Sequence, residues 1–402
     1  MKKFIMSVQH LFAMFGATVL VPILTGFNPA VAIFCAGLGT LIFHFCTKRK
    51  VPVFLGSSFA FIPVIIATKD AYNGDLSYAQ GGIIVAGFIY VILSIVVKFV
   101  GVKKIKKFFP PQVTGSMIIV IGLNLLPTAF QMAAQNYLLA CITLGIAILI
   151  NVFGRGFIKQ LGILLAVLSG YIISVFVGVV DLSSIGSAGL LSFPQFTMPK
   201  FSLQAIVIIA PVVLAVVMEH IGDITTNGSV VGENFIEEPG LNRTLLGDGL
   251  ATLVAGFLGG PANTTYGENT AVLAITKNYD PSILRMTAVL AIVLSCVGKF
   301  AAFLQSIPSA VMGGVSIMLF SMITYVGFKT IRDSSCFKNN RNLTVILLIL
   351  LIGLGTSYLS NKGVTIGIPI TSTVKITGLS LAAIVGIIIN RIVNDYEFKR
   401  EG

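Results

Sequence analysis

Long apolar segments recur along the whole 402-residue chain, separated by short segments that contain most of the lysine and arginine. A helix needs about 20 apolar residues to cross a ~30 Å hydrocarbon layer. Only 10% of the residues are charged and 55% are hydrophobic, whereas soluble domains carry about 25% charged residues. A soluble enzyme, a disordered chain and a nucleic-acid-binding protein are therefore excluded as the main interpretation. The pattern predicts an all-α polytopic membrane protein.

The apolar segments predict about fourteen transmembrane spans, each bounded by charged residues, proline or glycine. The segments at 52–67, 244–257 and 261–276 are too short or too polar to be ordinary spans. The predicted spans lie near 7–25, 30–46, 52–67, 80–97, 110–127, 137–153, 160–180, 203–222, 244–257, 261–276, 284–304, 308–327, 342–359 and 377–393.

The distribution of basic residues predicts how the chain is oriented. With the N-terminus placed in the cytoplasm, the cytoplasmic segments contain 22 lysine and arginine residues and the outer segments contain 5. Cytoplasmic loops of membrane proteins carry such an excess of basic residues. We therefore expect a multi-pass protein with cytoplasmic N- and C-termini.

Two pairs of segments resemble each other across the chain. Residues 52–61 and 261–270 both begin with proline and continue through small, polar and aromatic residues. Residues 109–116 and 307–314 open two further spans in a similar way. Both pairs are offset by seven spans, and because seven is odd, the two halves are predicted to be inverted repeats.

The third and tenth predicted spans are interrupted by glycine and proline at matching places in the two halves. Such interruptions are the best sequence indication of a transporter site, because non-helical backbone inside a membrane must line a cavity or be buried in protein. The alternative is a pair of tight helix-packing segments without a ligand.

Three acidic residues stand out because they lie in or directly beside predicted spans. Glu219 follows an unbroken apolar run, Asp223 lies four residues later on the same helix face, and Glu268 lies in the tenth span. Carboxylates within a membrane usually mark substrate, ion or proton pathways. The alternative of acids paired with Lys or Arg for assembly is weaker, because the eighth and tenth spans contain no such partner. For Asp248, a similar role and a simple capping role remain equally open.

The sequence contains no catalytic or metal-binding pattern. His10, His44 and His220 have no metal-ligand spacing, and no phosphate-binding loop of an ATPase is present. We therefore expect a secondary transporter with no enzymatic activity, cofactor or metal site.

Several motifs resemble the nucleobase–ascorbate transporter family, and bacterial uracil permeases in particular. The resemblance covers nearly the whole chain in the correct order, and the Thr-Thr-Tyr-Gly-Glu-Asn motif is highly specific. The matching segments are 9–22, 55–61, 219–222, 263–269 and 308–316.

This resemblance implies a fold of two inverted seven-span repeats, with short strands in the third and tenth spans. It also implies a core domain of about residues 1–107 and 203–304 and a gate domain of about 108–202 and 305–402. The implied activity is nucleobase uptake coupled to protons or sodium, most specifically uracil with protons. The resemblance further implies a homodimer in the inner (plasma) membrane of a bacterial cell, without a nucleic-acid partner.

The same resemblance implies a set of substrate-binding residues. Uracil presents two N–H donors and two carbonyl acceptors, and carboxylates accept hydrogen bonds from N–H groups. Glu219 and Glu268 would hold the ring N–H groups, and the backbones of Phe59 and Gly267 would meet the carbonyl groups. Tyr266, Ala17 and Phe320 would line the apolar walls. Glu219, Asp223 and Glu268 would couple transport to protons.

Two positions depart from the family pattern. Asp223 stands where close uracil permeases have histidine, and Ala271 stands where the signature usually has glycine. A second carboxylate at position 223 would change the proton relay or admit a cation. Both departures leave the identity of the transported nucleobase open.

Two alternatives therefore remain. One is a symporter of the same family for xanthine or another purine. The other is an anion transporter or channel with the same architecture, which the carboxylates disfavour because an anion site needs cationic side chains or helix N-termini without nearby acids.

Overall fold

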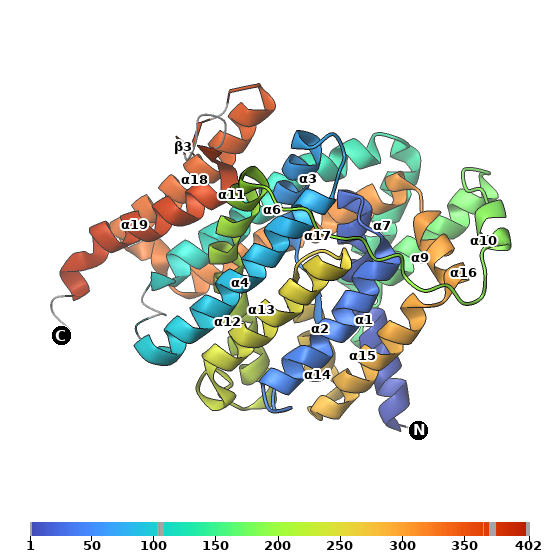
Figure 1. The fold of residues 1–402 in the computed structure, drawn as a ribbon, viewed down its shortest axis with the longest axis horizontal. Coiled ribbons are helices and arrows are strands. Elements are labelled where there is room, and N and C mark those ends of the chain that lie inside the picture. The colour runs from blue at the N-terminus through green and yellow to red at the C-terminus, as the bar shows by residue number, and fades with distance from the viewer. Residues whose placement is uncertain (1, 103, 105–107, 365, 370–374, 399–402) are drawn as a thin grey trace.

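The computed structural model describes residues 2–102, 104, 108–364, 366–369 and 375–398. Most of these residues belong to helices that pack side by side (Figure 1), and two very short strands in the chain are fully buried. Residues 399–402, which carry the predicted cytoplasmic C-terminus, lie outside the described part of the chain.

The first half of the chain and the linker after it contain the following elements: α1 (Lys2–Thr25), α2 (Pro29–Cys46), β1 (Leu55–Ser57), η1 (Phe59–Phe61), α3 (Ile62–Ala71), α4 (Ser77–Val100), α6 (Pro111–Ala133), α7 (Tyr137–Phe153), α8 (Gly156–Gln160), α9 (Gly162–Phe176) and α10 (Ser183–Ser187).

The second half begins with α11 (Leu203–Ile209), η2 (Ala210–Val212), α12 (Val213–Val231), η3 (Ile236–Gly240), α13 (Leu241–Leu258), β2 (Asn263–Thr265) and α14 (Gly267–Thr276). It continues with α15 (Pro281–Ser295), α16 (Gly298–Gln305), α17 (Ser309–Asp333), η4 (Cys336–Lys338), α18 (Asn340–Asn361), β3 (Ile368–Pro369), β4 (Lys375–Ile376) and α19 (Gly378–Phe398).

These elements correspond to the fourteen predicted spans. Within the described residues, 7 helices are long and apolar enough to cross a membrane, counting 203–231 as one. The shorter apolar helices α7, α9, α15 and α19 account for further spans. The remaining three are α13 and the two interrupted spans, which are β1 with η1 and α3, and β2 with α14.

Contacts between helices repeat with the predicted offset of seven spans. The packing of α4 on α13 has its counterpart in the packing of α15 on α2, and that of α18 on α6 in that of α7 on α17. Two further contacts, α2 with α13 and α6 with α17, join equivalent spans of the two halves. The prediction of two inverted repeats is therefore confirmed.

The two interrupted spans meet as an antiparallel strand pair. Leu55 lies opposite Thr265, and Ser57 lies opposite Asn263. Because an isolated non-helical segment in a membrane would leave its backbone groups without partners, each strand supplies the hydrogen bonds that the other lacks. The strands predicted in the third and tenth spans are confirmed.

Two predicted spans differ from expectation. The ninth, which looked too short, is the continuous helix α13, and its polar and glycine residues are tolerated because it packs between α2 and α4 inside the protein. A side chain at Gly247 or Gly249 would collide with Phe43 or Tyr90. The eleventh, expected as one segment, is divided into α15 and α16 at 296–297.

The linker between the two halves crosses the ends of several helices of both repeats. Figure 1 shows it as a long green trace from α10 to α11. Leu191 pairs with Val297 between α15 and α16. Further along, the Lys200 N–H donates to the Ser77 carbonyl over 2.9 Å, and its ammonium group lies 2.8 Å from Asp75. The linker is thus fastened to the helix ends along most of its length.

Candidate functional site

Buried hydroxyl groups hold the two strands at their crossing. The Leu55 N–H donates to Thr40 Oγ1 of α2 over 2.9 Å, and Thr252 Oγ1 of α13 donates to the Asn263 carbonyl over 3.0 Å. Both threonine side chains are fully buried. α2 and α13 are equivalent helices of the two repeats, so each repeat fixes its strand with a threonine from its second helix.

The ring of Tyr266 lies across β1. Its hydroxyl group donates to the Ser57 carbonyl over 3.0 Å. A Cβ atom at Gly56 would come within 2.3 Å of that ring. Because the protein interior is closely packed, such a contact would force the ring to move. Glycine at position 56 is therefore required for this arrangement.

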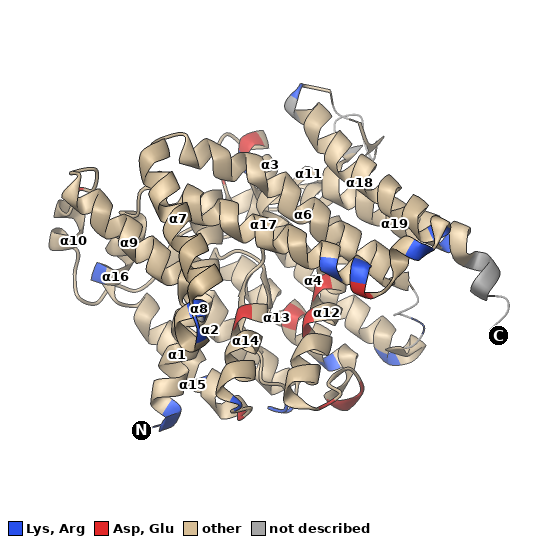
Figure 2. Ribbon diagram, turned by 180° about the vertical axis from the view of Figure 1, so that it is seen from behind, with Lys and Arg blue, Asp and Glu red and all other residues tan. Residues whose placement is uncertain are grey.

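The three carboxylates predicted for the site lie on two neighbouring elements beside the strands. Glu219 and Asp223 belong to α12, and Glu268 lies in the first turn of α14. Thr265 Oγ1 of β2 donates to Asp223 over 3.3 Å, and α12 packs against α14. All three side chains are half-buried, and Figure 2 shows acidic residues of these helices in the middle of the molecule.

A stripe of small and polar residues leads away from the carboxylates. On α12, Gly222, Thr226 and Ser229 are exposed, and on α14, Gly267 and Ala271 are exposed. Such residues suit a water-filled route better than a lipid-facing surface, which favours bulky apolar residues. α14 ends at Thr276, and the loop that follows is joined to the N-terminal segment by an ion pair of 2.7 Å between Asp280 and Lys3.

Aromatic and small residues close the opposite side of the site. Phe59 and Phe320 have ring centroids 6.2 Å apart in an edge-to-face arrangement, and both are buried. Ala17 is also buried, and the next residue, Thr18, accepts a hydrogen bond of 3.3 Å from Ser57. The structure therefore places Ala17 on the helix that packs against β1 and Phe320 against Phe59, directly after β1.

Phe59 and Gly267 each open a helical segment directly after a strand. Phe59 begins η1, which continues into α3, and Gly267 begins α14. The first N–H groups of a helix have no partner within that helix, and they attract electronegative atoms. Both positions can therefore offer backbone N–H groups to a ligand at the strand crossing.

Asp248 contacts a histidine rather than the three other carboxylates. Its Oδ2 atom lies 2.8 Å from His220 Nδ1, and the other ring nitrogen of His220 lies 2.9 Å from Thr244 Oγ1. All three side chains are 0% exposed. Because Asp248 lies in the interior of α13, the interpretation of this residue as a simple helix cap is wrong.

Comparison with known proteins places these features in a family. Residues 1–362 match the family model described as "Permease family". The uracil permease of Bacillus caldolyticus is 41% identical over 404 residues, covering 96% of this chain and 91% of that protein. The chain belongs to this permease family. It is a transporter and not an enzyme, as the resemblance implied.

Two solved structures share the fold of this permease. The structure of SLC26A9 has a TM-score of 0.73 at 10% identity, covering 98% of this chain and 65% of that one. The transmembrane domain of the cyanobacterial bicarbonate transporter BicA has a TM-score of 0.61 at 15% identity, covering 97% and 96%. At such low identity these likenesses concern the fold alone.

Several site-supporting residues of the permease were missed by sequence reasoning. Asn227 donates to the Pro52 carbonyl and to Thr270 Oγ1, each over 3.0 Å. Asn269 lies 3.1 Å from His10 Nδ1. For Asn269 the available signal was an amide inside the tenth predicted span, where a buried polar group needs hydrogen-bond partners. Asn227 lies beyond the predicted end of the eighth span, so no such signal marked it.

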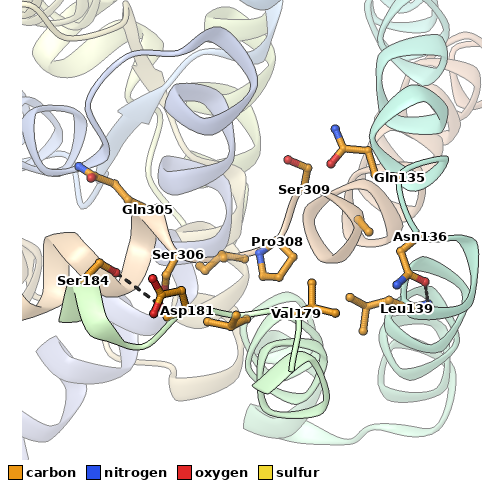
Figure 3. A pocket seen from close by; sticks show the side chains of 13 residues that line it. Gln135, Asn136, Leu139, Val179, Asp181, Ser184, Gln305, Ser306, Pro308 and Ser309 are labelled. Atoms are coloured by element: carbon orange, nitrogen blue, oxygen red, sulfur yellow. Dashed lines mark hydrogen bonds between the residues drawn. The ribbon is translucent and has the colours of Figure 1, made fainter. Parts of the chain in front are cut away.

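One pocket of the permease lies away from the carboxylates. It has a volume of about 480 Å³ and lies where α6 meets α7, α9 meets α10 and α16 meets α17 (Figure 3). Its carboxylate, Asp181, already accepts hydrogen bonds from the Ser183 N–H and hydroxyl groups, and these lower its pKa. None of the predicted site residues lines this pocket, so it is separate from the candidate site at the strand crossing.

Proposed function

We propose that this permease imports uracil together with protons across the inner (plasma) membrane of a bacterial cell. The observation that carries the proposal is that Glu219 on α12 and Glu268 on α14 lie on two helices that pack against each other beside the crossing strands. The proposal is supported by the name of the relative from Bacillus caldolyticus, "Uracil permease", at 41% identity.

The polar groups at the crossing match the edges of a uracil ring. In the proposed complex, Glu219 and Glu268 accept hydrogen bonds from the two ring N–H groups. The backbone N–H groups at Phe59 and Gly267 donate to the carbonyl oxygens. Tyr266, Ala17 and Phe320 provide the flat apolar walls. A site built on such hydrogen bonds rejects analogues that leave its polar groups unpaired.

Proton coupling follows from the clustering of carboxylates. Glu219, Asp223 and Glu268 share one region, and like charges in a poorly solvated site repel each other. A proton on one carboxylate and a substrate N–H on another both reduce that repulsion. We propose that proton and uracil therefore bind together, with Asp223 acting as the third proton-carrying group.

Alternating access requires two parts that move relative to each other. We propose a core of about residues 1–107 and 203–304 and a gate of about 108–202 and 305–402. The gate presents Phe320 against Phe59 of the core, whose rings lie 6.2 Å apart. Rocking of the core along the gate would expose the strand crossing to one side of the membrane and then to the other.

The orientation follows from the charge distribution. With both termini in the cytoplasm, the exposed stripe on α12 and α14 faces the cytoplasmic end of the protein, which carries Lys3 and Asp280.

We also propose that the permease forms a homodimer, which the resemblance implies. Sodium remains the second candidate for the coupling ion.

The proposal is tested by uptake of radiolabelled uracil into sodium-free proteoliposomes with an imposed inward proton gradient. The wild type is expected to accumulate uracil only with the gradient. Glu268→Gln is expected to lose concentrative uptake, whereas Glu237→Gln, at an exposed position, is expected to retain it. Full accumulation by Glu268→Gln would refute the role of that carboxylate, and accumulation only with sodium would refute proton coupling.

A purine symporter is the second candidate, and Asp223 is the observation that favours it. This residue replaces the histidine expected in close uracil permeases and accepts a hydrogen bond from Thr265. Excess xanthine should abolish labelled uracil uptake by a purine carrier and leave uptake by a uracil carrier unchanged.

A further inference from the structure

A second concave surface of the permease is entirely apolar. It has a volume of about 300 Å³, and all 10 residues that line it have apolar side chains. Leu93 and Val97 of α4, Val217 of α12 and Leu245 of α13 form one wall, while Phe108 and Ile387 belong to the other. We refer to this surface as the α4–α19 groove.

The α4–α19 groove lies within membrane-spanning helices. α4 is one of the long apolar helices and α19 one of the shorter ones. Ile388, which also lines the groove, is 52% exposed. The surface is therefore open toward the surroundings of these helices, which in a membrane are lipid acyl chains.

Basic residues gather at one end of the groove. Lys98 follows Val97 directly and is exposed, and Lys104 is exposed in the following linker. The guanidinium carbon of Arg391 lies 5.9 Å from the centre of the Phe108 ring. A phosphate group at this end would meet positive charges close to the apolar surface.

We propose that the α4–α19 groove binds an anionic phospholipid, with one acyl chain in the groove and the phosphate group on Lys98 and Lys104. The apolar lining would hold the acyl chain of the lipid, and the basic residues at its end would favour a negatively charged headgroup. This inference depends on the membrane location that the family establishes. It does not depend on uracil as the substrate.

The permease contains no tryptophan, so a single introduced tryptophan reports on its own surroundings. Ile388→Trp places the reporter at the groove, and Val289→Trp on α15 is a matched control, since these residues are 52% and 49% exposed. The full-length variants are reconstituted in vesicles that contain increasing fractions of brominated phosphatidylglycerol or brominated phosphatidylcholine.

Ile388→Trp is expected to be quenched at a lower fraction of phosphatidylglycerol than of phosphatidylcholine, whereas Val289→Trp should respond equally to both. Removing one basic contact should weaken the preference roughly fivefold, so Lys98→Gln with Lys104→Gln should nearly abolish it. Phe108→Trp is a second reporter in case Ile388→Trp does not fold.

Two results would overturn the proposal. Equal quenching of the groove reporters by both lipids would mean that the basic rim selects no headgroup. Absence of quenching by either lipid would mean that protein, from this chain or from a second copy, covers the groove.

Discussion

At the scale of single residues, the site depends on side chains that are absent as much as on those that are present. Gly56 leaves the space that the Tyr266 ring occupies, at 2.3 Å from where a Cβ atom would stand. The motif that contains Gly56 was recognised in the sequence, but the tyrosine that needs this space lies about 200 residues later. The sequence predicted both residues near the site and did not predict their contact.

The first prediction concerns this contact. Gly56→Ala should displace the Tyr266 ring and abolish uracil binding, because the ring supplies one wall of the proposed site and bonds to the Ser57 carbonyl. Binding is measured by calorimetry on the purified protein. Gly145→Ala, at a helical position where nothing lies within 4 Å of the added carbon, should bind like the wild type. Normal binding by Gly56→Ala would contradict the proposed wall.

A second prediction concerns the departure at position 223. Because Asp223 accepts a hydrogen bond from Thr265, Asp223→Asn can keep this contact while removing the charge. We expect uracil binding to persist and proton-driven accumulation to fall at least tenfold, measured in the same proteoliposomes. Unchanged accumulation would exclude Asp223 from the proton pathway.

At the scale of elements, the interruptions of the third and tenth spans were predictable because proline, glycine and polar residues cannot continue an apolar helix. The register of the strand pair was not predictable. It is fixed by buried groups on other helices, such as Thr40 on α2 and Thr252 on α13. For α13, the polar and glycine residues wrongly indicated that the ninth span was not an ordinary helix. Because α13 is buried between two other helices, it does not need apolar residues on every face.

A third prediction tests how α2 fixes β1. Thr40→Val removes the oxygen that accepts the Leu55 N–H and leaves a buried donor unpaired, which costs about 1–3 kcal/mol. A lower thermal unfolding temperature in detergent is the expected result. Thr143→Val provides the control, because this equally buried threonine bonds only to the Leu139 carbonyl of its own helix, so its loss should have a much smaller effect. Equal effects would show that the strand contact adds no stability.

At the scale of the whole molecule, the inverted repeat was predictable from two pairs of similar segments, and the recurring helix contacts confirm it. The path of the linker after α10 was not predictable. It contains few residues with strong structural preferences, and its course follows from contacts with helix ends that only the assembled fold brings together.

A fourth prediction concerns the end of this linker. The Lys200 ammonium group, together with Ser77, lowers the pKa of Asp75 from 3.8 to about 2. A lowered folded-state pKa means that this interaction stabilises the fold above the unfolded value and is lost as the pH falls through the folded one. Asp75→Asn should therefore lower the unfolding temperature slightly near neutral pH, and the difference from the wild type should shrink below about pH 4.

Lys200→Gln is the matched partner in this experiment and should reproduce the profile of Asp75→Asn, because either change removes the same ion pair. The Lys200 and Asp75 side chains are 57% and 34% exposed, so water screens the ion pair and the changes in unfolding temperature will be small. A difference from the wild type that persists unchanged at acid pH would contradict this assignment.

The strand pair also has a consequence for biosynthesis. Thr265, which lies opposite Leu55 in the register, is synthesised more than 200 residues later, so the first strand lacks its inter-strand hydrogen bonds until then. Until then, unpaired backbone groups must remain in water or in contact with the insertion machinery, because lipid offers them no partners. Neither half of the chain, produced alone, can therefore contain a finished site, whereas two separately produced halves that meet in one membrane have everything required to build it.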